Sequence, residues 1–267
     1  MGAGLAVLIL LLASVAGAGM PVHGAPPSRC LSCHPVHYAD RGGCAVCHRG
    51  NERTSRPELA HAGLIKGRYA VFTGPDNQEV AQGNRLSDRS GCRRCHVMKR
   101  TGNRLASDLD GLFWSSTPAQ IDAALTDPTL FMPEFQFSQH DRDLLIIAIL
   151  AAGYHVTPAA TQPPQIVHFA DQPTRTATVF EQKCGGCHKL LSARNGGLGG
   201  GSAGPNLSGL LTRYYPASFT GRQVWTEQRL KRWLANPRRI RPFAGMRPVP
   251  LKPDEFAQLY RILAPTD

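Results

Sequence analysis

The eight cysteines constrain this chain more than any other feature, because all of them lie in four copies of one short pattern, Cys-x-x-Cys-His. The copies are Cys30–His34, Cys44–His48, Cys92–His96 and Cys184–His188. This pattern is typical of c-type haem attachment, in which both thiols become thioethers to the macrocycle and the histidine binds iron from one face. The sequence therefore predicts four covalently attached haems. No cysteine remains for a disulfide or a free thiol.

The predicted haem-binding residues follow directly from the four copies. The thioether sulfurs are assigned to Cys30, Cys33, Cys44, Cys47, Cys92, Cys95, Cys184 and Cys187. The proximal iron ligands are assigned to His34, His48, His96 and His188. A single copy could equally belong to a redox-active dithiol, but four copies that consume every cysteine favour haem.

The start of the chain indicates export. Residues 3–20 are apolar and uncharged, and Ala16-Gly17-Ala18 has the small-x-small pattern of a signal-peptidase site. We expect residues 1–25 to be a signal peptide and the mature protein to lie in the periplasm or at the exterior of a bacterium, since c-type haem is attached outside the cytoplasm. The alternative is an uncleaved membrane anchor, because the apolar stretch is close to the minimum length of a span.

Composition favours small domains over one large domain. The 267 residues include 27 glycines and 21 prolines, and only 7% are aromatic. Small domains bury little apolar surface, and a haem supplies part of the missing core. We therefore expect the chain without haem to be largely unfolded.

Residues 26–66 are predicted to form a dihaem module. Only nine residues separate His34 from Cys44, so the two haems must be close neighbours, and no segment here is long enough to form a core of its own. His37 and His61 are candidate distal ligands. His37 is too close to His34 in sequence to reach the far face of the same haem, so it suits the neighbouring haem, and His61 suits the other. Alternatively, both are surface histidines and both irons are open.

Two helical regions follow, residues 67–155 and 176–267, joined by a Pro-rich linker at 156–175. Each begins with a haem unit. In each, a threonine opens a helical segment that ends eleven residues later at a proline, Thr117 to Pro128 and Thr226 to Pro237. The apolar positions of the two segments coincide, so the chain contains an internal duplication.

Further helices are predicted within these regions. Thr176–Lys183 is expected to be a short helical lead-in to the last haem unit. Ser138 and Asp141 have the spacing of a capping box, and the apolar positions after them share one helical face. A terminal amphipathic helix is expected around Phe256 and Leu263.

Both helical regions resemble class I cytochrome c domains. The second copy carries the resemblance in Gly204-Pro205-Asn206-Leu207, Trp225, Leu234, Asn236-Pro237 and Gly245-Met246. The resemblance implies His/Met axial pairs, His188 with Met246 and His96 with Met132. The alternative for each methionine is a flexible core filler. The first copy lacks the Gly-Pro and has a shorter interval to its methionine, so His140 is a rival ligand there.

The N-terminal module instead resembles the bis-His packing of multihaem periplasmic cytochromes, among them those of metal-reducing bacteria. Together, these resemblances imply a mainly α fold, with two small all-α class I cytochrome c-like domains and a haem-packed, loop-rich dihaem module.

The formal net charge of +11 is concentrated in the last third, where residues 172–267 hold 15 Lys and Arg against 5 Asp and Glu. Four haems would add about eight propionate carboxylates, which offset most of the surplus. The charge therefore does not indicate a nucleic-acid partner. A solvated basic face and a docking surface for an acidic redox partner both remain open. A membrane partner is expected only if the N-terminal segment is uncleaved.

The sequence contains a candidate sixth ligand for each of the four irons, which favours electron transfer over catalysis. No catalytic residue is predicted. We expect a carrier between respiratory partners, with metal or oxyanion respiration (selenite or tellurite, for example) as a suspected context. The alternatives are a haem enzyme, either a dihaem-type peroxidase or an oxyanion reductase, and a filament-forming multihaem cytochrome. An enzyme would require an open iron position.

Overall fold

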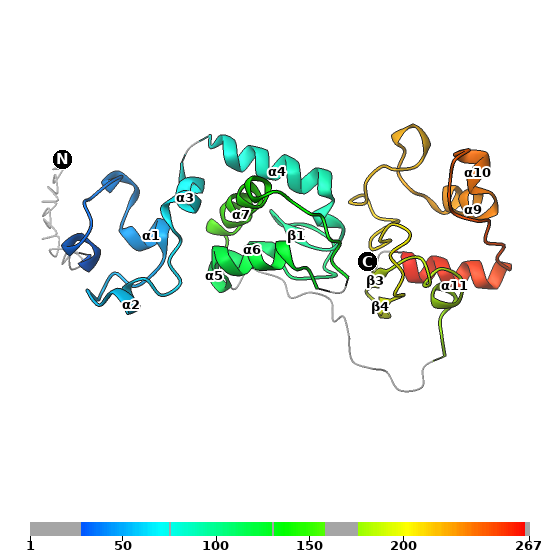
Figure 1. Ribbon diagram of the computed structural model, residues 1–267, viewed down its shortest axis with the longest axis horizontal. Helices are drawn as coiled ribbons and strands as arrows, with labels where there is room; N and C mark the ends of the chain where they lie inside the picture. Colours follow the sequence, from blue (N-terminus) through cyan, green and yellow to red (C-terminus); the bar gives the residue numbers. More distant parts are fainter. Residues whose placement is uncertain (1–27, 75, 130, 158–175, 265–267) are drawn as a thin grey trace, which may run out of the picture.

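The computed structural model describes residues 28–74, 76–129, 131–157 and 176–264. The described chain is mainly α, with short helices connected by long loops, and its strands form two small antiparallel hairpins. Figure 1 shows three parts in a row: an N-terminal part that carries the first two Cys-x-x-Cys-His units, a central part and a C-terminal part. The predicted signal peptide, and the linker from residue 158 onward, lie outside the described residues. No helix of the described ranges is long and apolar enough to cross a membrane.

The N-terminal part has only short helices and no core. The 3₁₀-helices η1 (Arg29–Ser32) and η2 (Ala39–Arg41) precede α1 (Cys44–His48), which is the second haem unit itself, and α2 (Pro57–Ala60). No residue from 28 to 64 is buried, and Ile65 is the first that is. The expectation that this segment lacks a core of its own is confirmed.

The central part is built around one long helix, α7 (Gln139–Tyr154). Its other elements are α3 (Gly67–Ala70), η3 (Val71–Thr73), α4 (Gln78–Ser90), η4 (Cys92–Arg94), β1 (Val97–Met98), β2 (Thr101–Gly102), η5 (Leu109–Gly111), α5 (Leu112–Ser115) and α6 (Pro118–Thr126). Residues 144–150 of α7 are all buried, so this stretch faces protein on every side. The sequence predicted one apolar face for this helix, but the buried surface extends around it because α4, α5 and α6 all pack against α7.

Helices α4 and α7 cross at a glycine. A Cβ added to Gly83 of α4 would lie 2.1 Å from the backbone oxygen of Leu144 and 2.7 Å from the Cβ of Ala148. The two backbones therefore approach as closely as a glycine allows. This crossing places the end of α4, and with it the third haem unit, against α7.

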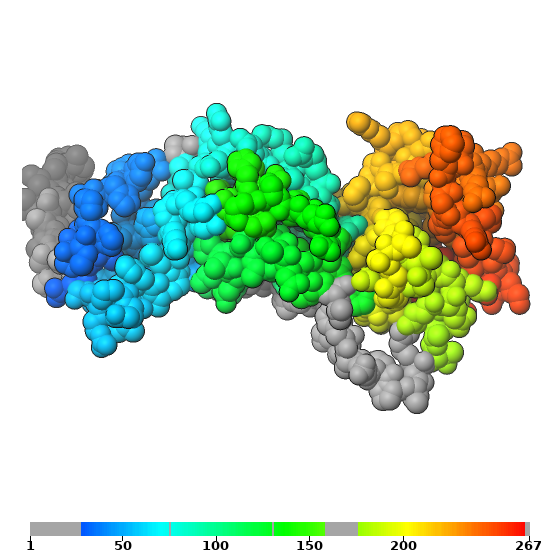
Figure 2. Space-filling view, in the orientation of Figure 1, coloured from blue at the N-terminus to red at the C-terminus, as the bar shows by residue number. Residues whose placement is uncertain are grey.

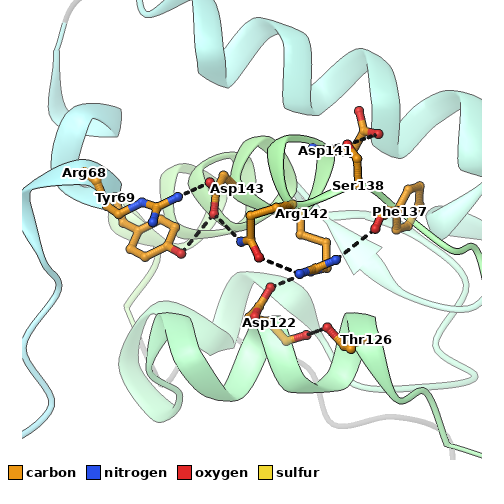
Figure 3. Close-up of polar contacts among 10 residues, drawn as sticks. Arg68, Tyr69, Asp122, Thr126, Phe137, Ser138, Asp141, Arg142 and Asp143 are labelled. Atoms are coloured by element: carbon orange, nitrogen blue, oxygen red, sulfur yellow. Dashed lines mark hydrogen bonds and ion pairs between the residues drawn. The ribbon is translucent and has the colours of Figure 1, made fainter.

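A polar cluster joins the surface of α7 to α3 and α6 (Figure 3). Asp143 pairs with Arg68 and accepts a hydrogen bond from Tyr69 Oη at 3.0 Å. Arg142 Nε donates to Asp122 Oδ1 at 2.7 Å. Burial, and then the hydrogen bond to Asp143, raise the pKa of Tyr69. The cluster fixes α3, which connects the N-terminal part to the central part.

The C-terminal part has its own hydrophobic core. Its elements are α8 (Val179–Lys183), β3 (Leu190–Ser192), β4 (Gly196–Leu198), η7 (Thr220–Arg222), α9 (Glu227–Ala235), α10 (Pro237–Ile240) and α11 (Pro253–Leu263). Phe180, Leu198 and Leu259 are at most 2% exposed in a cluster distinct from the one around α7. Helices α8 and α11 pack together in this core. The space-filling view shows the C-terminal part in contact with the central part (Figure 2).

Helix boundaries agree with the capping signals in the sequence. Thr117 caps α6 in a capping box with Gln120, and Ser138 caps α7 through Asp141. Thr226 caps α9. The predicted lead-in at 176–183 begins three residues later, because Thr178 is its N-cap.

Candidate functional site

The third Cys-x-x-Cys-His unit opens into an apolar cavity of about 430 Å³ in the central part. Cys92, Cys95 and His96 form one wall. The rest of the lining is largely apolar and includes Leu109, Ile121, Ala124, Leu125, Leu145 and Ile149. The volume is in the range of pockets that hold cofactor-sized ligands.

His96 is held with one ring nitrogen turned to the backbone. Its Nδ1 lies 2.8 Å from the carbonyl oxygen of Ser107. Because a carbonyl can only accept, Nδ1 is the donor and Nε2 is left as a free lone-pair ligand. Burial lowers the pKa of His96, which favours the neutral imidazole that binds a metal.

The same contact recurs at two other haem units. His188 Nδ1 lies 2.8 Å from the carbonyl oxygen of Pro205, and His48 Nδ1 lies 2.9 Å from that of Ile65. Such contacts fix the tautomer and the orientation of a metal-binding histidine. The sequence did not predict Ser107, Pro205 or Ile65 as partners, because a backbone carbonyl leaves no residue signature.

The sulfurs of Cys92, Cys95 and Cys184 lie in surroundings that suit thioethers, whereas Cys33 and Cys187 are exposed. Burial raises the pKa values of Cys92 and Cys95, and it raises that of Cys184 to about 11. Buried, protonated thiols of this kind are poor nucleophiles, which argues against a redox-active dithiol. A thioether carries no charge, so burial in apolar surroundings costs it little.

In the N-terminal part, the structure brings the four histidines together in two pairs. Nε2 of His37 lies 3.4 Å from Nε2 of His48, and the rings of His34 and His61 have centroids 6.0 Å apart. The pairing is the one expected from the sequence. These two pairs would hold the iron of a haem attached at each of the two N-terminal units.

Of the two rival ligands expected at the third Cys-x-x-Cys-His unit, only one lies at the cavity. Met132 lines it together with His96. His140 is exposed in the first turn of α7 and is not part of the cavity wall. The arrangement favours Met132.

In the C-terminal part, Met246 is half-buried against the core, and its Sδ accepts a hydrogen bond from Trp233 Nε1 at 3.0 Å. Gly204 packs directly on the His188 ring, because an added Cβ would lie 2.2 Å from Cε1. This contact accounts for the glycine of the Gly204-Pro205 pair.

Comparisons of the chain with protein-family models, curated proteins and solved structures gave no match. In the described ranges, no three His, Cys, Asp or Glu side chains gather to hold a free metal ion. Each unit instead offers two cysteine sulfurs, which would bond a haem macrocycle covalently, and a histidine, which would bind its iron. These residues fit a c-type haem, whose macrocycle would supply further iron ligands.

Two arginines next to the haem-unit residues were missed as site residues by sequence reasoning. Arg49, directly after His48, donates through Nη1 to the carbonyl oxygens of Phe113 and Ser116 at 2.6 and 2.7 Å. Burial lowers the pKa of Arg49. Arg94, between Cys92 and Cys95, is only 9% exposed. Their place beside the cysteines was the only available signal.

Proposed function

We propose that the chain is a tetrahaem c-type cytochrome that carries electrons between respiratory partners outside the cytoplasm. One observation carries the proposal. Two sulfurs, an oriented neutral histidine and a methionine, from Cys92, Cys95, His96 and Met132, share a single apolar cavity.

The bound haem iron supplies reversible one-electron chemistry. The protein's residues provide the rest. The cysteines would fix the macrocycle, the backbone carbonyls orient the histidines, and the largely apolar walls would surround the haem. With both His96 and Met132 bound to the iron, no position is left for a substrate, which favours transfer of an electron.

The proposed architecture is a bis-His dihaem module at 26–66 joined to two class I cytochrome c-like domains at 67–155 and 176–267. Support comes from the two hydrophobic clusters and from the late methionine in each part. His/Met ligation raises the haem potential relative to bis-His ligation. The four haems are therefore proposed to rise in potential from the N-terminal pair toward the C-terminal domain.

A basic surface on the C-terminal domain supports an acidic redox partner. Phe243 is 101% exposed, and Arg239, Arg241 and Arg247 near it in sequence are exposed as well. A fully exposed aromatic ring among cations is typical of a docking surface whose charges steer the partner. The rate of electron transfer to such a partner is expected to fall steeply with ionic strength.

Absorption, EPR and mass spectra of the exported, purified protein test the proposal. We expect four covalently bound haems per chain and a wholly low-spin, six-coordinate spectrum. Spectroelectrochemical titration should resolve two lower and two higher potentials. A high-spin signal with peroxide turnover would identify an enzyme instead, and a protein without covalent haem would overturn the proposal. Fractionation of the native host tests the proposed export.

A further inference from the structure

A buried cation in the third Cys-x-x-Cys-His unit, Arg94, contacts the C-terminal part. Arg94 lies between the two cysteines of the third unit, is 9% exposed and forms part of the cavity wall beside His96. Its Nη1 donates to the carbonyl oxygen of Asn206 at 3.2 Å, and its guanidinium lies over the Tyr215 ring, 5.5 Å from the centroid. Asn206 and Tyr215 both belong to the C-terminal part.

The loop that Arg94 contacts is the one that orients the fourth haem's histidine. The carbonyl of Pro205 accepts from His188 Nδ1, and the next carbonyl along the chain, that of Asn206, accepts from Arg94. Tyr215 Oη donates to this same Asn206 oxygen at 3.1 Å. One short piece of backbone therefore connects the two haem units.

The junction, which is the contact between the central and C-terminal parts around Arg94, is closely packed. Asn103 Nδ2 donates to the carbonyl of Arg94 at 2.9 Å and lies 3.1 Å from Thr212 Oγ1 across the junction. Gly209 has a φ of +70°, and a Cβ there would lie 2.7 Å from the Arg94 oxygen. Asn206 Nδ2 also donates to the carbonyl of Phe131 at 2.8 Å. These contacts resist rotation of one domain against the other.

Arg94 forms no ion pair with the residues that the structure describes, so none of them neutralises its charge. A carbonyl oxygen and an aromatic ring satisfy the guanidinium but do not neutralise it. Its neighbour Arg93, in contrast, pairs with Asp88. A buried, unneutralised cation exerts a strong field because little water screens it. Oxidised haem carries one more positive charge than reduced haem, so this field favours the reduced state.

We propose that Arg94 is a positioning residue that couples the third and fourth haems: its charge raises the potential of the third, and its contact with Asn206 fixes the third relative to the fourth. The inference rests on the proposed function, because it requires haem at both units. It adds a specific contact through which the two high-potential sites influence each other.

The test compares Arg94→Gln, Arg94→Lys and Arg93→Gln in the full haem-loaded chain by spectroelectrochemical titration. Arg94→Gln should lower one high potential by about 59 mV, which is a tenfold change in a one-electron equilibrium. Arg94→Lys should restore most of the shift because it keeps the charge. Arg93→Gln removes a neutralised cation from the same unit and should change no potential by more than about a fifth of that amount.

A second variant provides the test if Arg94→Gln does not fold and incorporate haem. Gly209→Ala keeps the charge but pushes the junction apart at the Arg94 carbonyl, so water should reach the guanidinium and the same potential should fall by a smaller amount. Unchanged potentials in Arg94→Gln would overturn the inference. If Arg94→Gln does not incorporate haem, unchanged potentials in Gly209→Ala would overturn it instead. Equal shifts in Arg94→Gln and Arg94→Lys would also overturn it. A wild-type chain that lacks covalent haem would instead overturn the proposed function, so the two failures are distinguishable.

Discussion

A single hydrogen bond orients each of several candidate iron ligands. His48, His96 and His188 each turn Nδ1 to a backbone carbonyl, and Met246 accepts from an indole N–H. The histidines and cysteines themselves were predictable, because each haem unit is a contiguous pattern. Their partners were not, since any residue type supplies a carbonyl and only the fold determines which one is near.

The ligand of the third haem can be tested by two substitutions. Met132→Ala should convert that iron to a high-spin or water-bound state, because the residue lines the same cavity as His96. His140→Ala should leave the spectrum unchanged, since the side chain is exposed outside the cavity wall. Near-infrared absorption and EPR distinguish the states. The opposite pattern would assign His140 as the ligand.

Trp233 should tune the fourth haem through Met246. Its N–H withdraws electron density from the thioether, so Trp233→Phe should strengthen electron donation to oxidised iron and lower the potential. Loss of one hydrogen bond is worth about 1 kcal/mol, or about 40 mV for one electron. Redox titration measures this shift. Trp114→Phe, which removes a hydrogen bond to the Val156 carbonyl instead, is the control and should leave the fourth haem unaffected.

Among the elements, those with a clear cap were predictable and those without apolar periodicity were not. Helices α6, α7, α9 and α11 each begin with a capping residue or a proline, and each has an apolar face. Helix α4 was missed, although Asn77 caps it, because its residues are mostly polar and its contact with α7 is made through Gly83. The hairpins β1–β2 and β3–β4 are too short to show an alternating pattern.

The α4–α7 crossing gives a stability prediction. Gly83→Ala should destabilise the protein by about 1–3 kcal/mol, because the added methyl group overlaps the Leu144 carbonyl and the helices must separate. Denaturant unfolding of the haem-loaded protein measures the loss. Gly67→Ala is the matched control, since nothing lies within 4 Å of its added Cβ. Equal stabilities of the two variants would show that the crossing is looser than described.

For the whole molecule, the spacing of the Cys-x-x-Cys-His units predicted the order of the parts, but not their junctions. The duplication inferred from Thr117–Pro128 and Thr226–Pro237 stays a prediction. Arg49 and Arg94 connect neighbouring parts through carbonyls more than 60 residues away in sequence. A pattern read along the chain contains no information about such distant acceptors.

In the proposed cytochrome, the N-terminal part should depend on bound haem for order. Replacing Cys30 and Cys33 with alanine should expose this part to trypsin at Arg53 and Arg56, because no side chain from 28 to 64 is buried. Limited proteolysis with mass spectrometry detects the new cuts. The Cys184/Cys187 double alanine variant is the comparison, and its fragment should persist longer because the C-terminal part has a hydrophobic core. Identical digestion rates would contradict this reasoning.

The linear order of the three parts affects how such a protein would turn over (Figure 1). A small carrier with one contact surface must leave its donor before it meets its acceptor, so each cycle includes a dissociation and a diffusive search. A chain with redox sites at opposite ends can hold both partners at once. Its throughput then becomes independent of solvent viscosity and continues even when both complexes are long-lived.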